Sequence, residues 1–302
     1  MDKRRAAPLF GLAVALLWGL SFLSIKVAVG AIPPMSLAAA RFILAVAVLP
    51  LLALAAKEDL RVKARDLPLL AAGGLVGVTI YFLCENNGVS LLSASESSLI
   101  IGTIPILTLV AERLFLGTRL GPRTYVGAAL SVAGVTLIVL RSGGGGGGAP
   151  SSTTGYLYMA GAAVSWVVYG FLTRPVASRH GKICVTFWQS LFGLAGCIPF
   201  ALAESGSWAP VSLPVALNVA YLGLLCSAAG YWLYISALDT LGAGKASVFI
   251  NLIPVVSVVA AYILRGERLG PGQLAGGLVA VAGVYLATVP ARAAARGKAT
   301  PA

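Results

Sequence analysis

The chain has 302 residues, of which 58% are hydrophobic and 11% charged, and its formal net charge is +12. Soluble domains carry about 25% charged residues, so this composition excludes an ordinary soluble domain. Apolar runs repeat along the whole length, which also excludes a soluble domain held by a single anchor. We predict an all-α integral membrane protein that is surrounded by the lipid bilayer.

A membrane-spanning helix needs about 20 predominantly apolar residues, and about ten segments approach that length. They are, in chain order, Pro8–Val29, Met35–Ala56, Leu67–Cys84, Leu92–Phe115, Tyr125–Leu140, Tyr156–Leu172, Ile183–Ala203, Leu213–Ala237, Ala243–Leu264 and Gly272–Val289. The basic residues before the first segment are typical of a signal peptide, but no small-residue cleavage pattern follows it. We therefore expect the first segment to be retained as a span.

The stretch Ser142–Thr154 reads SGGGGGGAPSSTT, which is typical of a flexible linker. It separates two groups of predicted spans. We therefore divide the chain into a first five-helix repeat (residues 1–141), the linker (142–154), a second five-helix repeat (155–290) and a cytoplasmic tail (291–302).

The two halves are copies of one another. The stretch that begins at Ser93 aligns without a gap with the stretch that begins at Gly242, 149 positions later (242 − 93), and this places Pro105 on Pro254. Such self-similarity indicates a tandem duplication. An odd number of spans in each half inverts the second copy in the membrane. We predict ten transmembrane helices as two inverted five-helix repeats around a central cavity.

Basic residues gather in the cytoplasmic loops of membrane proteins. If the N-terminus is cytoplasmic, most of the 22 Lys and Arg residues fall on the inner side, including those of the Lys57–Arg65 loop. The distribution predicts a multi-pass protein of the cell (inner) membrane with both termini in the cytoplasm. It also accounts for the positive charge without a nucleic-acid partner.

Each half opens with a tryptophan in its first span, Trp18 or Trp166, and closes with the pattern IP…G-x-RLG-P…G…AGV. In these features the chain resembles the EamA-type transporters of the drug/metabolite transporter superfamily, over nearly its whole length. The resemblance implies a cavity lined by the first, third, fourth, sixth, eighth and ninth spans, with the fifth and tenth packed outside. It also implies export of amino acids or other small metabolites, and the aromatic residues are similar to those of the amino-acid exporter branch.

Residues near the midplane of the predicted lining spans are candidates for substrate binding. They are Trp18, Ser21, Tyr81, Thr103, Trp166, Tyr169, Tyr231, Tyr234 and Asn251. Together they would form an aromatic, hydrogen-bonding pocket with little charge, which suits flat neutral or zwitterionic solutes. The alternative is that these rings form interfacial belts or pack between helices.

Pro105 and Pro254 occupy matching places and are expected to kink their helices, because proline removes a backbone hydrogen bond. Matched interruptions point to a transport site, where they would act as hinges; the alternative is a role in packing alone. Arg41, Glu85 and Glu96 fall near the outer ends of their spans, where Arg41 paired with either glutamate would form a gate. The alternative for Arg41 is snorkelling to the interface. We expect no carboxylate at a midplane, which disfavours export of cations in exchange for protons.

We predict an alternating-access exporter of small metabolites that works as a monomer, with aromatic or apolar amino acids as substrates. Facilitated and proton-coupled transport both remain open. A sugar-phosphate antiporter of the same fold is the alternative, although it should need paired cations in the cavity. An enzyme is disfavoured, because Ser21 has no intramembrane histidine to activate it. We expect no metal or cofactor, since His180 is the only histidine and the four cysteines form no C-x-x-C pair.

Overall fold

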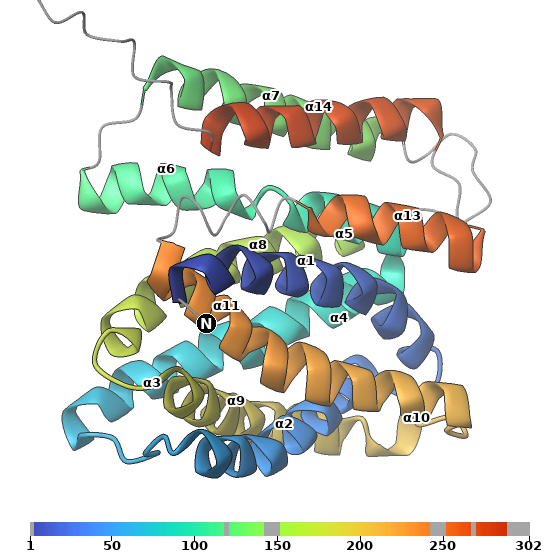
Figure 1. Cartoon of the computed structure of the whole chain (residues 1–302). Coiled ribbons are helices and arrows are strands. Elements are labelled where there is room, and N and C mark those ends of the chain that lie inside the picture. The colour runs from blue at the N-terminus through green and yellow to red at the C-terminus, as the bar shows by residue number, and fades with distance from the viewer. Residues whose placement is uncertain (1–2, 118–120, 142–151, 242–251, 267–269, 289–302) are drawn as a thin grey trace, which may run out of the picture.

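The computed structural model describes residues 3–117, 121–141, 152–241, 252–266 and 270–288, and all regular elements within these ranges are helical (Figure 1). The elements are α1 (Lys3–Ala28), α2 (Pro34–Ala56), η1 (Ala64–Asp66), α3 (Leu67–Gly74), η2 (Leu75–Ile80), α4 (Tyr81–Leu91), α5 (Ala94–Ile101), α6 (Ile104–Leu116), α7 (Pro122–Arg141), α8 (Thr153–Ala177), α9 (Lys182–Ala203), η3 (Ser205–Ser207), α10 (Leu213–Ala220), η4 (Tyr221–Ala229), α11 (Gly230–Leu241), α13 (Ile253–Arg265) and α14 (Pro271–Thr288).

Seven helical segments are long and apolar enough to cross a membrane. They are Leu9–Ala28, Pro34–Ala56, Ala64–Leu91, Ala94–Phe115, Thr153–Ala177, Lys182–Ala203 and Leu213–Ala237. The other three predicted spans overlap α7, α13 and α14, which do not reach this length and hydropathy over their described residues. The all-helical fold is confirmed, while the count of ten spans and their inverted arrangement stay predictions.

Two of the long segments contain a π-helical stretch at corresponding places. In the first half it is η2, which directly precedes Tyr81, and in the second half it is η4, which ends shortly before Tyr231. A π-helix widens the turn by shifting backbone hydrogen bonds to i→i+5, and such stretches often mark functional sites. The sequence analysis did not predict them.

The kink expected in the fourth span is a break between two helices. α5 ends at Ile101, Gly102 and Thr103 follow, and Pro105 lies in the first turn of α6. Proline is well tolerated there, because first-turn N–H groups have no intrahelical acceptor. Pro254 holds the same place in α13. A Cβ added to Gly102 would lie 2.6 Å from Pro254 Cγ, so the two interruptions pack directly against each other.

α2 and α9 lie against each other and exchange carboxylate caps. Glu58, just after α2, accepts a hydrogen bond from the backbone N–H of Cys184 in the first turn of α9, at 2.8 Å. Glu204, just after α9, accepts from the N–H groups of Met35 and Ser36 in the first turn of α2, at 3.2 and 2.7 Å. Carboxylates stabilise helix N-termini, where backbone N–H groups are unpaired and the dipole is positive. This reciprocal capping requires α2 and α9 to be antiparallel.

α7 and α14 form a closely packed pair at the edge of the bundle, at the top of Figure 1. A Cβ added to Gly134 would overlap the backbone of Ala280, and one added to Gly283 would overlap the backbone of Ser131. Adding the 149-residue shift between the copies converts Gly134 to Gly283 and Ser131 to Ala280. The two contacts are therefore the same contact made once by each copy. Small residues at both contacts let the two helices approach closely.

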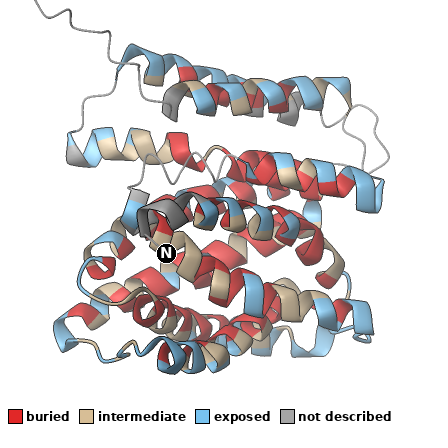
Figure 2. Ribbon diagram, viewed as in Figure 1, coloured by how far each residue is buried: buried red, intermediate tan, exposed pale blue. Residues whose placement is uncertain are grey.

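The distribution of apolar side chains is that of helices surrounded by lipid. Buried residues concentrate where the inner helices meet (Figure 2). Many large apolar side chains lie on the surface instead, among them Leu54, which is 78% exposed, and Phe115, which is 79% exposed. In water such a surface would favour aggregation, whereas a bilayer covers it.

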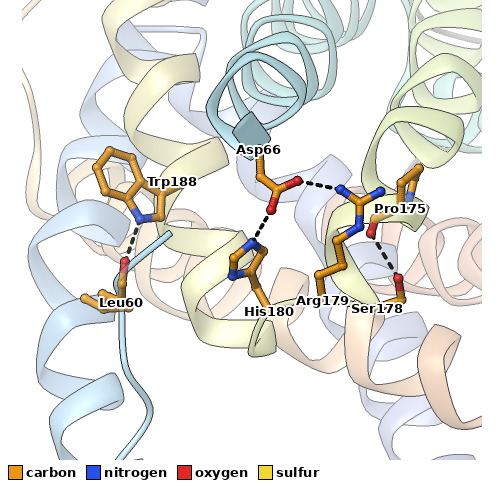
Figure 3. A network of polar contacts seen from close by, with 7 residues as sticks. All are labelled: Leu60, Asp66, Pro175, Ser178, Arg179, His180 and Trp188. Atoms are coloured by element: carbon orange, nitrogen blue, oxygen red, sulfur yellow. Dashed lines mark hydrogen bonds and ion pairs between the residues drawn. The ribbon is translucent and has the colours of Figure 1, made fainter. Parts of the chain in front are cut away.

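A polar network joins the two halves at the end of the bundle where α2 leads into α3 (Figure 3). Asp66 is buried, and its Oδ1 accepts a hydrogen bond from Arg179 Nη1 at 2.5 Å. Its Oδ2 lies 2.9 Å from His180 Nε2. Nearby, Trp188 Nε1 donates to the carbonyl oxygen of Leu60 at 2.8 Å. The network ties the segment between α2 and α3 to the connection between α8 and α9.

Candidate functional site

A cavity lies between helices of both halves. Its lining residues come from α1, α2, α4, α5, α6, α8, α11 and α13, and they are Trp18, Ser21, Phe22, Arg41, Tyr81, Phe82, Glu85, Ile101, Ile104, Trp166, Tyr231 and Ile253. None of these lining residues belongs to α7 or α14, which pack at the edge of the bundle. We take this cavity as the candidate site.

Aromatic rings from both halves meet around the cavity. Trp18 and Trp166 contact each other edge to face, with ring centroids 5.3 Å apart. Tyr231 lies 5.7 Å from Trp18 and 5.6 Å from Trp166. The connected cluster contains most of the residues predicted to bind substrate, namely Trp18, Tyr81, Trp166, Tyr169, Tyr231 and Tyr234. Such edge-to-face pairs are each worth about 0.5–1.5 kcal/mol beyond area burial.

The π-helical stretches supply the acceptors that hold two of these rings. Trp18 Nε1 donates to the carbonyl oxygen of Cys226 in η4 at 3.1 Å, and the Tyr231 hydroxyl donates to the carbonyl oxygen of Gly77 in η2 at 3.2 Å. Each ring is therefore fixed by the π-helix of the opposite half. Gly77 also permits close approach, since a Cβ there would overlap the ring of Tyr169.

The cavity is small in this conformation. Its volume is about 30 Å³, which has room for about two water molecules. To bind an amino acid, the site would need its lining side chains to move apart.

The remaining predicted residues have different surroundings. Ser21 lines the cavity, and its hydroxyl donates to the carbonyl oxygen of Trp18 in its own helix at 2.7 Å. Thr103 is not among the lining residues, and its hydroxyl donates to the carbonyl oxygen of Ile100 at 2.7 Å, at the break between α5 and α6. Asn251 lies outside the described residues.

Two charged residues line the cavity, contrary to the expected pocket of little charge. Arg41 is 2% exposed and Glu85 is 5% exposed. Snorkelling of Arg41 is therefore wrong, because its guanidinium points inward. Arg41 Nε donates to Ser227 Oγ at 2.8 Å, and Glu85 Oε1 accepts from the Tyr81 hydroxyl at 2.7 Å. Over the described ranges, no ion pair joins Arg41 to a glutamate, so the predicted gate is not formed in this conformation.

Glu96, the third residue of the predicted gate, lies apart from the cavity lining. It forms a capping box with Ser93 at the start of α5. Its Oε1 accepts a hydrogen bond from the Tyr156 hydroxyl of α8 at 3.0 Å. These contacts give Glu96 a place in helix capping and packing.

The sequence predicted that Glu85 lies near the outer end of its span, and the helical segment continues past it to Leu91. Asn86 Nδ2 donates to the carbonyl oxygen of Pro34 at 2.8 Å, while Asn86 Oδ1 is buried without a hydrogen-bond partner among the described residues. The sequence analysis did not predict that Glu85 lines the cavity together with the aromatic residues. The absence of a carboxylate from the membrane midplane stays a prediction.

Comparison with known proteins identifies the family. The model of the EamA-like transporter family matches residues 5–140 and again residues 153–289. The chain belongs to the EamA-like transporter family. The resemblance drawn from the sequence is thus confirmed, and so is a transporter with many apolar membrane helices.

Relatives of known name are similar over most of the chain. A protein of Streptantibioticus cattleyicolor named "Probable terminal-alkyne amino-acid exporter" is 31% identical over 231 residues, which cover 75% of this chain and 74% of the relative. A Salmonella typhimurium protein named "Probable amino-acid metabolite efflux pump" is 26% identical over 290 residues, covering 91% of this chain and 92% of the relative. A solved crystal structure aligns with a TM-score of 0.68 at 24% identity, over 94% of this chain and 98% of that chain, which shows the fold.

One lining residue comes from a span that the family resemblance did not place at the cavity. Most of the cavity lining comes from the spans that the resemblance implied. Arg41 is the exception, because α2 corresponds to the second span, which was not among them. A charged side chain thus enters the site of this EamA-family transporter from an unexpected helix.

Proposed function

We propose that this protein exports small metabolites by alternating access, with aromatic or apolar amino acids as its substrates. The observation that carries the proposal is the aromatic cluster of the cavity, to which both halves contribute. Trp18 on α1 and Trp166 on α8 meet at 5.3 Å, so a solute between them would contact both halves at once. The names of two relatives, an amino-acid exporter and an amino-acid metabolite efflux pump, support this substrate class.

Reciprocal contacts support an inverted arrangement of the halves. α2 and α9 cap each other with Glu58 and Glu204. The contacts of Gly134 and Gly283 between α7 and α14 also exchange places. Reciprocity of this kind arises when two copies are related by a twofold axis. Because α2 and α9 are antiparallel, the axis would run across these helices, as it does in transporters with inverted repeats, where it lies in the membrane plane. The basic loops support cytoplasmic termini and the inner membrane as the location.

Opening of the site would require the rings of the two halves to separate. The break between α5 and α6 and the start of α13 are the points at which the backbone could bend, and Pro105 and Pro254 lie there. Both halves of the cavity come from one chain, which supports a monomer as the working unit. Among the lining residues Arg41 is the only Lys or Arg, and the carboxylate of Glu85 balances it. This charge balance favours a zwitterion over the sugar phosphate of the alternative function.

Uptake into vesicles tests the proposal. The full chain is reconstituted, and initial rates are measured for labelled phenylalanine, leucine, threonine and glucose 6-phosphate, with and without a pH gradient. We expect saturable uptake of phenylalanine and leucine, with empty vesicles and the Trp18→Ala/Trp166→Ala double variant as controls. Transport of glucose 6-phosphate alone would favour the antiporter, and vesicles that take up no amino acid would overturn the proposal.

A further inference from the structure

We propose that Arg41 binds the carboxylate of the transported amino acid in the cavity, and that Glu85 receives its ammonium group. The inference rests on the proposed function and specifies how that site would recognise its substrate. The two charged groups would fix the backbone of the amino acid, while the rings of the cavity would contact its side chain.

The first observation is an unsatisfied nitrogen on Arg41. Its Nη1 is buried and has no hydrogen-bond partner among the residues that the structure describes. The rest of the guanidinium is held in place, because Nε donates to Ser227 Oγ at 2.8 Å and Cζ lies 4.3 Å above the centre of the Phe82 ring. A buried charged donor without an acceptor is strongly unfavourable. Arg41 lines the cavity, and its Nη1 retains unused hydrogen-bonding capacity that an anion could satisfy once the site opens.

The second observation is that the nearby acid makes no direct contact with Arg41. Glu85 lines the same cavity, yet its Oε1 accepts a hydrogen bond from the Tyr81 hydroxyl at 2.7 Å. In the described part of the chain, the two charges form no ion pair. Opposite charges that are held apart across one small cavity match the two ends of a zwitterion. The pair also leaves the site neutral, so a neutral solute adds no net charge to it.

The chemistry of guanidinium narrows the ligand to a carboxylate. The planar donor edge of arginine matches the two oxygens of a carboxylate, which a lysine cannot reproduce. Ser227 belongs to η4 in the second half, whereas Arg41 and Glu85 belong to the first. A carboxylate bound to Arg41 would therefore lie at the junction of the two halves.

The test compares ligands that differ in one charged group. Labelled phenylalanine uptake by the full chain in vesicles is inhibited with phenylalanine, phenylalaninamide or 3-phenylpropionate, and inhibition constants are measured. Charge-assisted hydrogen bonds predict that phenylalaninamide inhibits wild type about 10- to 100-fold more weakly than phenylalanine. Arg41→Gln and Arg41→Lys should weaken phenylalanine and abolish this preference. Glu85→Gln should instead abolish the preference of phenylalanine over 3-phenylpropionate. Arg61→Gln, at an exposed arginine, is the matched control.

A measurement on the wild type keeps the proposal falsifiable if the Arg41 variants do not fold. Thermal unfolding of the wild type in detergent is followed with and without each compound. Phenylalanine should protect the protein against unfolding, and phenylalaninamide at the same concentration should protect it less. Equal inhibition or equal protection by the two compounds would overturn the role of Arg41 while amino-acid transport itself stands. If the wild type transports no amino acid, the proposed function fails first, and this assignment fails with it.

Discussion

The protein buries charge in two regions that differ in how completely the charge is partnered. In the network around Asp66, both carboxylate oxygens have partners, Arg179 at 2.5 Å and His180 at 2.9 Å (Figure 3). In the cavity, Arg41 is equally buried, but its Nη1 has no partner among the described residues. A satisfied charge holds segments together, whereas an unsatisfied one is a source of instability unless a ligand completes it. The comparison therefore favours a structural role for the Asp66 network and supports the proposed role of Arg41 in substrate binding.

The largest effect expected from this comparison is at Arg41. The double variant Arg41→Met/Glu85→Gln removes both buried charges of the cavity and keeps side chains of similar size, and such replacement of both partners is often neutral or stabilising. We expect the free energy of unfolding to rise or to stay within about 1 kcal/mol of wild type, while the apparent affinity for phenylalanine falls about 10- to 100-fold. Thermal unfolding in detergent and vesicle uptake measure the two quantities. A large loss of stability with unchanged affinity would mean that Arg41 has a structural role, and the proposed difference between Arg41 and the Asp66 network would then be wrong.

The opposite pattern is expected at Asp66. Asp66→Asn leaves Arg179 and His180 without a charged acceptor, and we expect the free energy of unfolding to fall. The loss is kept modest by solvent, because the Arg179 side chain is 44% exposed. The preference for phenylalanine over phenylalaninamide should not change. Asp59→Asn, at an exposed residue, is the matched control, and a changed preference in Asp66→Asn would contradict the assignment.

The aromatic rings sharpen the comparison within the cavity itself. We propose that Arg41 binds the carboxylate of the substrate and that the rings contact its side chain. Trp18→Ala and Trp166→Ala should then each weaken the apparent affinity for phenylalanine about two- to tenfold. The affinities for threonine and alanine should fall less. Trp208→Ala, at a tryptophan that is 46% exposed outside the cavity lining, serves as control. Equal losses for all substrates would mean that the tryptophans only hold α1 and α8 together.

Much of the fold and the ring cluster could be predicted from the sequence, because hydrophobic runs and the internal duplication report directly on burial and symmetry. The matching positions of Trp18 and Trp166, on spans that the family resemblance places at the cavity, predicted that the two rings face one site. The place of Glu85 in the cavity lining could not be predicted, because Asn86 and Asn87 end the apolar run although the helix continues and both of their Nδ2 groups donate to backbone carbonyl oxygens. The π-helices leave no composition signal, so the carbonyls that hold Trp18 and Tyr231 could not be predicted either.

Arg41 shows the limit of sequence reasoning most clearly. The side chain of an arginine in the first third of an apolar run can extend to the membrane surface or point into the protein. The sequence pattern of the run does not distinguish these two orientations. The choice depends on contacts with Ser227, which lies 186 positions away in the chain. Only the packed structure brings these two residues together.

The smallest expected effect concerns the two reciprocal caps, which are satisfied charges like Asp66. Glu58→Gln and Glu204→Gln each remove a carboxylate from a helix N-terminus and should lower the free energy of unfolding by about 0.3–1 kcal/mol. α2 has 23 residues, so the caps lie about 35 Å apart, and the losses in the double variant should add. Glu112→Gln, inside α6, is the control for loss of a glutamate charge away from a cap. Glu204 accepts two backbone hydrogen bonds and Glu58 accepts one, so Glu204→Gln should cost at least as much as Glu58→Gln. Thermal unfolding in detergent measures both losses. A loss in only one of the two variants would mean that the two halves are not equivalent at α2 and α9, and it would weaken the case for a twofold relation between them.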